Sequence, residues 1–127
     1  MKYFACPLKE FSLGFPANLT DRIIYAPEDA AGRETAETYI TVPELLSLKD
    51  TASPHGIVLK PECGDKTVLL VPRIDLEIEI PEENIHKLPE AFSERLRIIR
   101  GISFTERNMI LILDPIEICR SAGGLKI

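Results

Sequence analysis

The side chains best suited to catalysis or metal binding are few in this sequence, and they are scattered. His55 and His86 are the only histidines, and neither lies in a recognisable metal-ligand motif. The cysteines are odd in number, far apart and without a C-x-x-C pair; they are Cys6, Cys63 and Cys119. Disulfide frameworks and zinc sites use even or closely spaced sets of such residues. We therefore expect free thiols in a reducing compartment, no metal site and no cofactor.

Three carboxylates come closest to a catalytic cluster. In the stretch from Ile74 to Ile80, they alternate strictly with apolar residues, so that on a β-strand all three would point to one face. These carboxylates are Asp75, Glu77 and Glu79. A solvated strand face is the more common role of such a pattern. The sequence also lacks the phosphate-binding motifs G-x-G-x-x-G and G-x-x-x-x-G-K and the G-x-S-x-G motif of serine hydrolases. We predict that the protein is not an enzyme.

The composition fits one globular domain. The chain has 127 residues, of which 45% are hydrophobic and 28% are charged, and its formal net charge is -5. An acidic surface repels phosphate backbones, so we do not expect nucleic acid as a partner. The apolar runs, such as Met109 to Leu113, are too short to span a bilayer, and the first residues contain no secretory hydrophobic region. We expect a single domain over residues 1–127, located in the cytoplasm.

Two hairpins stand out in the second half of the sequence. Gly56–Lys60 and Thr67–Val71 are apolar runs joined by a segment that contains the turn signal Gly64-Asp65. Arg97–Phe104 and Met109–Leu113 form a second pair of strand-like runs, joined by a short polar turn. Each pair predicts two antiparallel strands.

Prolines and glycines mark where the neighbouring elements begin and end. Pro72 lies between two strand-like stretches and predicts a bulge, a bend or a sheet edge, and a bend there would let the chain pass from one sheet to another. The predicted strand Ile74–Ile80 follows this bend. Asp114 before a proline predicts the start of a short helix over Pro115–Ser121, and Gly123-Gly124 is expected to end it.

The N-terminal third has weaker strand patterns. We expect a loop over Glu28–Thr38, where small and polar residues gather, and one or two turns of helix over Pro43–Leu48. The predicted strands here are Lys2–Pro7, Glu10–Phe15, Leu19–Ala26 and Tyr39–Val42. The whole chain thus has about eight to ten short strands and very short helices, which favours an all-β barrel or sandwich.

Four segments of the C-terminal half resemble the CheW-like domain family, and they occur in the family's order. Lys66–Ile78 is similar to a hydrophobic run and the strand after it, although Pro72 replaces the acidic residue that is usual there. Ile85–Pro89 is similar to the family's "I-x-x-L-P" segment. The other two similar segments are Ile99–Ser103, which resembles an "I-x-G" strand, and Met109–Ile116, which resembles the closing strand and helix.

The N-terminal half resembles the family less closely. Phe11–Ala17 with Arg22–Ile24 is similar to the opening strands, and Tyr39–Leu48 is similar to a later strand and turn. Only eleven residues lie between Pro27 and Tyr39. The family carries a longer strand pair at this place, with an Asn-Leu-Arg-Gly motif that this sequence does not contain.

The resemblance implies both a fold and a function. CheW-like domains consist of two β-barrels around a shared core, and they couple chemoreceptors to the histidine kinase CheA without catalysis of their own. The fold class implied here is all-β, with two small β-barrel subdomains sharing a core and the first barrel shortened. The function implied is an adaptor of chemotaxis-type signal transduction. Its implied partners are a CheA-type histidine kinase and the cytoplasmic tip of a chemoreceptor.

Partner contact is expected at a strand edge or in the crease between two barrels, where backbone groups and apolar side chains are exposed. The candidate partner-binding residues are Ile40, Val42, Leu45, Val68, Leu70, Gly101 and Ile102.

Three alternative functions stay open. The chain is a CheW-like module of another signalling complex, a small β-barrel that acts on or binds a ligand in a polar cavity, or a subunit that acts only as an oligomer.

Overall fold

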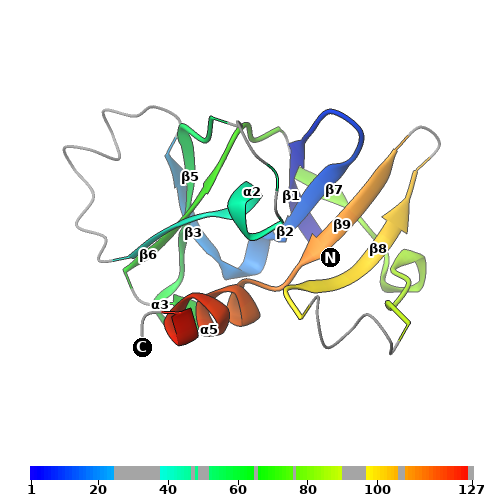
Figure 1. Cartoon of the computed structure of the whole chain (residues 1–127). Coiled ribbons are helices and arrows are strands. Elements are labelled where there is room, and N and C mark those ends of the chain that lie inside the picture. The colour runs from blue at the N-terminus through cyan, green and yellow to red at the C-terminus, as the bar shows by residue number, and fades with distance from the viewer. Residues whose placement is uncertain are drawn as a thin grey trace. The chain divides into compact units, whose positions relative to one another are not determined.

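The computed structural model describes residues 1–24, 38–46, 48, 52–64, 66–75, 77–89, 97–105 and 108–125. The chain forms two compact units, and each contains one β-sheet (Figure 1). The first unit combines the N-terminal segment Met1–Asn18 with the C-terminal segment Asp75–Ile127, and the second unit is the segment Leu19–Ile74 between them. The chain therefore begins the first unit, builds the second and then returns to complete the first.

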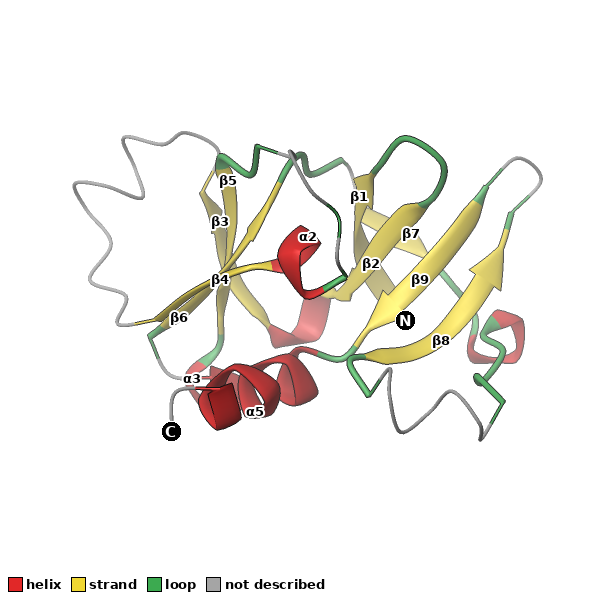
Figure 2. Cartoon of the chain, viewed as in Figure 1, coloured by secondary structure: helices red, strands yellow, loops and turns green. Residues whose placement is uncertain are grey.

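The first unit contains a five-stranded sheet in the order β7-β1-β2-β9-β8 (Figure 2). Neighbouring strands are antiparallel except β2 and β9, which are parallel. The chain beyond β7 also reaches the opposite edge of the sheet, because His86 and Ile102 exchange two backbone hydrogen bonds of 2.8 Å. The strands are β1 (Lys2–Pro7), β2 (Ser12–Pro16), β7 (Glu77–Glu79), β8 (Ile99–Phe104) and β9 (Met109–Leu113).

Side chains alternate between the two faces of these strands, and those on one face form the core of the first unit. A buried cluster is formed by Tyr3, Ile80, Ile110 and Ile112, and Ile78 and Ile85 pack against it. Gly101 of β8 faces the same interior. A Cβ atom at this position would lie 2.6 Å from Cγ2 of Ile85. The close approach of Ile85 therefore requires a residue without a side chain at position 101.

The second unit contains a four-stranded sheet in the order β3-β5-β6-β4, in which β4 is parallel to β6 and the other pairs are antiparallel. Its buried cluster comprises Ile24, Val58 and Val68, and Leu70 packs against it. The strands are β3 (Thr20–Ile24), β4 (Thr38–Thr41), β5 (His55–Leu59) and β6 (Thr67–Val71).

Helix α5 (Pro115–Leu125) is longer than the very short helices predicted. Its predicted N-cap is confirmed, because Oδ1 of Asp114 accepts hydrogen bonds from the backbone N–H groups of Ile116 at 3.0 Å and Glu117 at 3.4 Å. The predicted end at Gly123-Gly124 is wrong. Each glycine costs a helix about 1 kcal/mol relative to alanine, which lowers its stability without forbidding helical backbone. The other helical turns are η1 (Ala17–Leu19), α2 (Val42–Leu45), α3 (Pro61–Gly64) and η2 (Glu82–Asn84).

The predicted all-β class with two sheets is confirmed, as are the hairpins β5–β6 and β8–β9. Pro72 lies at the predicted passage from one sheet to the other, between β6 and β7. The strand predicted over Ile74–Ile80 is longer than β7, which spans Glu77–Glu79, although the N–H groups of Asp75 and Ile80 also donate to the carbonyl oxygens of Ala5 at 2.7 Å and Met1 at 3.0 Å. The predicted loop Glu28–Thr38 falls outside the described residues except for Thr38, which begins β4. Barrels around a shared core and a single-domain organisation stay predictions.

Candidate interaction surface

Most of the predicted partner-binding residues lie in the second unit. Three of them are core residues: the exposed fraction is 6% for Ile40 and 0% for both Val42 and Val68. Leu45 of α2 and Leu70 of β6 are half-buried. Only these last two side chains offer atoms to a partner without rearrangement, and the buried three can act only by supporting the surface above them.

The remaining two predicted residues lie on β8 in the first unit. Gly101 is buried and faces the interior, whereas Ile102 is half-buried and points to the other face of the sheet. Successive residues of a strand point to opposite faces, so these neighbours have different roles. Gly101 shapes the packing beneath the sheet, and Ile102 belongs to its outer face.

An exposed apolar surface surrounds Ile102. In the ladder between β8 and β9, Ile102 lies opposite Leu111, and Phe104 lies opposite Met109. All four side chains share the outer face, and Phe104 is 65% exposed, more than any other large hydrophobic residue that the structure describes. We call this surface the β8–β9 face; it consists of Ile102, Phe104, Met109, Leu111 and His86.

His86 joins the β8–β9 face through both its backbone and its ring. Its backbone is bonded to Ile102, which places the two side chains on the same side of the sheet. Its ring centroid lies 6.2 Å from that of Phe104, with an angle of 47° between the planes. The exposed phenyl ring is therefore supported on one side. Sequence reasoning selected Ile102 and missed Phe104, although the alternation in Ile102-Ser103-Phe104 predicts that both point outward.

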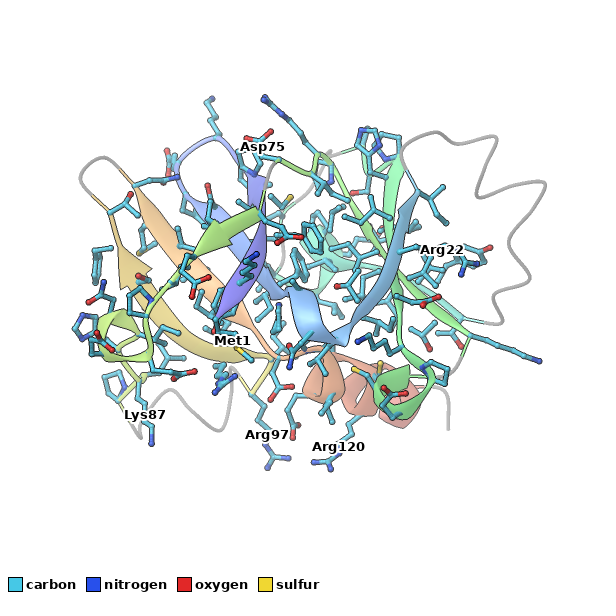
Figure 3. All side chains as sticks on the ribbon, turned by 180° about the vertical axis from the view of Figure 1, so that it is seen from behind. Met1, Arg22, Asp75, Lys87, Arg97 and Arg120 are labelled. Carbon is cyan, nitrogen blue, oxygen red and sulfur yellow. The ribbon has the colours of Figure 1, made fainter. Side chains whose placement is uncertain are left out.

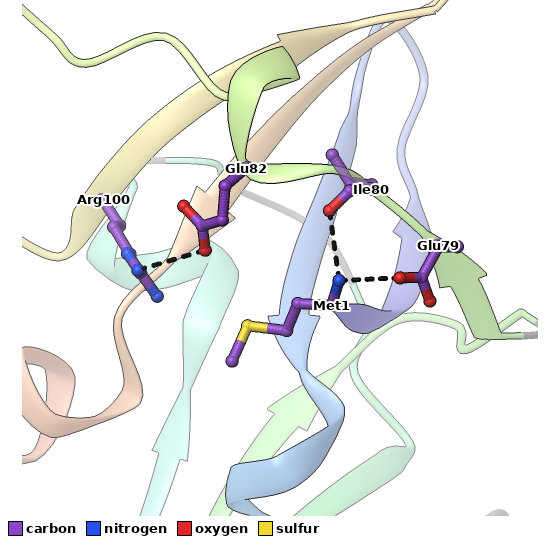
Figure 4. A network of polar contacts seen from close by, with 5 residues as sticks. All are labelled: Met1, Glu79, Ile80, Glu82 and Arg100. Atoms are coloured by element: carbon purple, nitrogen blue, oxygen red, sulfur yellow. Dashed lines mark hydrogen bonds and ion pairs between the residues drawn. The ribbon is translucent and has the colours of Figure 1, made fainter.

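Arg100 lies where the β8–β9 ladder shifts register, between Ile99 and Gly101, and its charge acts on the buried Tyr3. Arg100 is the only charged residue in strands β2, β8 and β9. Its Nη2 atom lies 3.5 Å from Oε1 of Glu82 (Figure 4), and the two side chains are 45% and 63% exposed. An exposed pair of this kind contributes at most about 1 kcal/mol, so the guanidinium group can still bind another carboxylate. Lys87 and Arg97 are exposed and extend from the same side of the unit (Figure 3).

A second polar contact lies between β1 and β7. The amino group of Met1 donates to Oε1 of Glu79 at 2.7 Å and to the carbonyl oxygen of Ile80 at 3.5 Å (Figure 4). The N–H of Ile80 in turn donates to the carbonyl oxygen of Met1 at 3.0 Å. These contacts extend the β1–β7 ladder beyond its last pair and have a structural role.

Tyr3 is a titratable group in the core of the first unit, and its environment is unusual. Its side chain is fully buried, and its hydroxyl has no hydrogen-bond partner among the described residues. Burial raises the pKa of Tyr3 above the usual value of 10.0; Arg100 opposes this rise, and Glu82 and Glu79 add to it. A phenol that stays protonated and has no base beside it is a packing residue rather than a catalytic one.

The acidic strand residues behave as the sequence predicts. Asp75, Glu77 and Glu79 are all exposed, as expected of a solvated strand face. Among the residues that the structure describes, no group of three or more His, Cys, Asp or Glu side chains is arranged to hold a metal ion. Within the same described part of the chain, no helix has the length and apolar character needed to cross a membrane.

Comparison with known proteins identifies the fold. No family model matches the sequence, and no curated protein matches it. The structure, by contrast, has a CheW-like fold, as the resemblance predicted. A matching solved structure is that of the scaffolding protein TtCheW from Thermoanaerobacter tengcongensis, with a TM-score of 0.65 and 17% sequence identity, covering 89% of this chain and 83% of that one. At this identity the likeness establishes the fold alone.

Proposed function

We propose that the protein is a non-catalytic adaptor of chemotaxis-type signal transduction that acts in the cytoplasm. Its proposed partners are a CheA-type histidine kinase and the cytoplasmic tip of a chemoreceptor, which it would hold in one complex. The observation that carries this proposal is the fold, since a chain described as a scaffolding protein shares it over 89% of the present chain.

The geometry of the first unit favours a binding role. An adaptor needs exposed apolar side chains on elements that keep their shape when a partner docks. The β8–β9 face has such side chains, and its strand β8 is bonded on one edge to β9 and on the other to His86. Of the predicted partner-binding residues, Ile102 contributes to this face. Leu45 and Leu70 would contribute to contacts of the second unit.

Binding to the purified partners tests the proposal. The chain is mixed with the regulatory domain of a CheA-type kinase, and separately with a soluble chemoreceptor tip, and each mixture is analysed by size-exclusion chromatography and titration calorimetry. We expect a complex with at least one of them at concentrations on the order of tens of micromolar. The absence of binding to both would refute the coupling function while leaving the fold unchanged.

A further inference from the structure

We propose that residues 81–89 form a strap that occupies the binding site of a partner's extended segment on the edge of β8, and that this segment replaces the strap when it binds. The segment would carry a β-branched aliphatic anchor, followed by a residue other than proline. The inference deepens the proposed adaptor function, on which its biological role rests. It is carried by the way in which the strap pairs with β8 and fills a gap at Gly101.

The strap covers an edge of the sheet through an isolated bridge. β8 is the last strand in the order of its sheet, and the η2 turn of the strap lies beside it (Figure 2). The N–H groups of His86 and Ile102 each donate to the other residue's carbonyl oxygen at 2.8 Å. An added antiparallel strand forms such pairs at a sheet edge. A replacing segment must therefore supply an N–H group at this position, which excludes proline.

The strap is anchored by Ile85 in a gap that β8 leaves at Gly101. A Cβ atom on Gly101 would lie 2.6 Å from Cγ2 of Ile85, so the isoleucine occupies the space of the missing side chain. There it packs against the buried cluster of the first unit. When a strand is added to a sheet edge, the backbone bonds supply affinity and the pockets for alternate side chains supply specificity. The gap therefore selects an isoleucine or valine directly before the paired residue.

The rest of the strap is held weakly. Ile85 and Leu88 are half-buried, and the other seven residues of the strap are exposed. Nη2 of Arg100 lies 3.5 Å from Oε1 of Glu82, and an ion pair between two exposed side chains contributes little (Figure 4). Segments with few buried side chains open at a lower free energy than the whole fold. The strap is therefore suited to leave the edge of β8 while the sheet stays intact.

Native-state hydrogen exchange of the wild type tests whether the strap opens on its own. The N–H groups of His86 and Ile102 report on the bridge, whereas that of Ser103 points to the opposite edge of β8 and reports on its pairing with β9. After correction for intrinsic rates, we expect the first two to exchange at least tenfold faster than the third, with a weaker dependence on denaturant. Equal rates and equal denaturant dependence would overturn the proposal.

A synthetic peptide with the sequence of residues 81–89 provides the probe for the edge of β8. It is titrated into isotope-labelled wild type and into Ile85→Ser, whose strap no longer fills the gap. The wild-type strap competes with the peptide at an effective concentration on the order of millimolar, because it belongs to the same chain. We expect the peptide to bind Ile85→Ser at least tenfold more tightly than the wild type and to change the amide shifts of Gly101 and Ile102.

Three controls isolate the role of the anchor. A peptide whose isoleucine is replaced by serine should not bind Ile85→Ser. Adding Gly101→Ala to Ile85→Ser should abolish binding of the original peptide, because the new Cβ atom takes the space of the anchor. Glu83→Gln changes an exposed residue of the strap and leaves the anchor in place, so this variant should bind the peptide as weakly as the wild type does.

Three results of the peptide experiment would also overturn the proposal. An Ile85→Ser chain that does not fold would show that the strap is part of the core and not a replaceable segment. Equal affinity of the two chains for the peptide, or shift changes confined to residues away from β8, would show that the peptide does not take the place of the strap. Because no kinase or receptor is present, these results are independent of the test of the coupling function.

Discussion

The substitution Gly101→Ala is expected to destabilise the first unit strongly. A Cβ atom at position 101 would lie 2.6 Å from Cγ2 of Ile85 and 2.9 Å from the carbonyl oxygen of His86. The oxygen cannot move away freely, because it accepts one of the two 2.8 Å hydrogen bonds that join His86 to Ile102. The methyl group must therefore displace both a core side chain and the bonded backbone.

The size of the effect follows from three contributions. Overpacking a core costs about 1–3 kcal/mol, and weakening one backbone hydrogen bond adds about 0.5–1.5 kcal/mol. Replacing glycine by alanine also lowers the conformational entropy of the unfolded chain, and this stabilising effect offsets about 0.4–1 kcal/mol of the loss. The net expectation is a decrease of about 2–3 kcal/mol in the free energy of unfolding.

Gly14→Ala is the matched control, since Gly14 also faces the core of the first unit. Its added Cβ would lie 3.0 Å from Cδ1 of Ile112 and 3.1 Å from Cγ2 of Ile110, both of which are side-chain methyl groups. These can shift by a few tenths of an ångström, so we expect a loss below about 1 kcal/mol. Urea denaturation and amide hydrogen exchange at Ile102 provide the measurements. Equal stability of Gly101→Ala and the wild type, or a larger loss for Gly14→Ala, would refute the reasoning.

Three further substitutions have expected outcomes that urea denaturation can check. Tyr3→Phe should raise the free energy of unfolding by about 1 kcal/mol, because it removes a buried hydroxyl without a partner. Because burial raises the pKa of Tyr3, the tyrosine ionises at a lower pH in the unfolded chain than in the folded one. Wild-type stability should therefore fall as the pH rises above about 10, and the stability of Tyr3→Phe should fall less. A variant that is less stable than the wild type at neutral pH would contradict the argument. Asp114→Ala should cost about 1 kcal/mol through loss of the α5 N-cap, and Asp114→Asn should retain most of that stability; equal losses in both would argue against capping. Phe104→Ser should change stability by less than about 0.5 kcal/mol, and a larger loss would mean that the ring contributes to packing within the protein.

Local sequence signals predicted the parts of the fold that depend on neighbouring residues. Both hairpins were predicted from apolar runs separated by a short turn, and the bend at Pro72 from the missing backbone donor. The parallel pairs β2–β9 and β4–β6 join strands that are far apart or not consecutive in sequence, and no local pattern encodes them. The length of β7 was likewise decided by a distant partner, because the alternation in Ile74–Ile80 sets which side chains share a face but not where β1 stops pairing.

The candidate surface was predictable only in part, for a related reason. Ile40, Val42 and Val68 are apolar residues in strand-like or turn segments, and sequence alone cannot distinguish a core position from an exposed one when both faces of a strand are apolar. Ile102 was selected as an apolar residue at an expected strand edge or crease between barrels. The alternation in Ile102-Ser103-Phe104 places Phe104 on the same face as Ile102, but the 65% exposure of its ring is known only from the structure.

The His86 bridge connects the stability of the first unit to the shape of the β8–β9 face. Each side chain that is immobilised on binding costs about 0.5–1.5 kcal/mol, and contact with the His86 ring restricts Phe104 before a partner arrives. Gly101→Ala would move the His86 backbone without changing any side chain of the face. We therefore expect it to change the side-chain NMR shifts of Phe104 as well as stability, whereas Gly14→Ala should leave these shifts near those of the wild type. Unchanged Phe104 shifts in Gly101→Ala, measured where the variant is fully folded, would show that the face does not depend on the bridge.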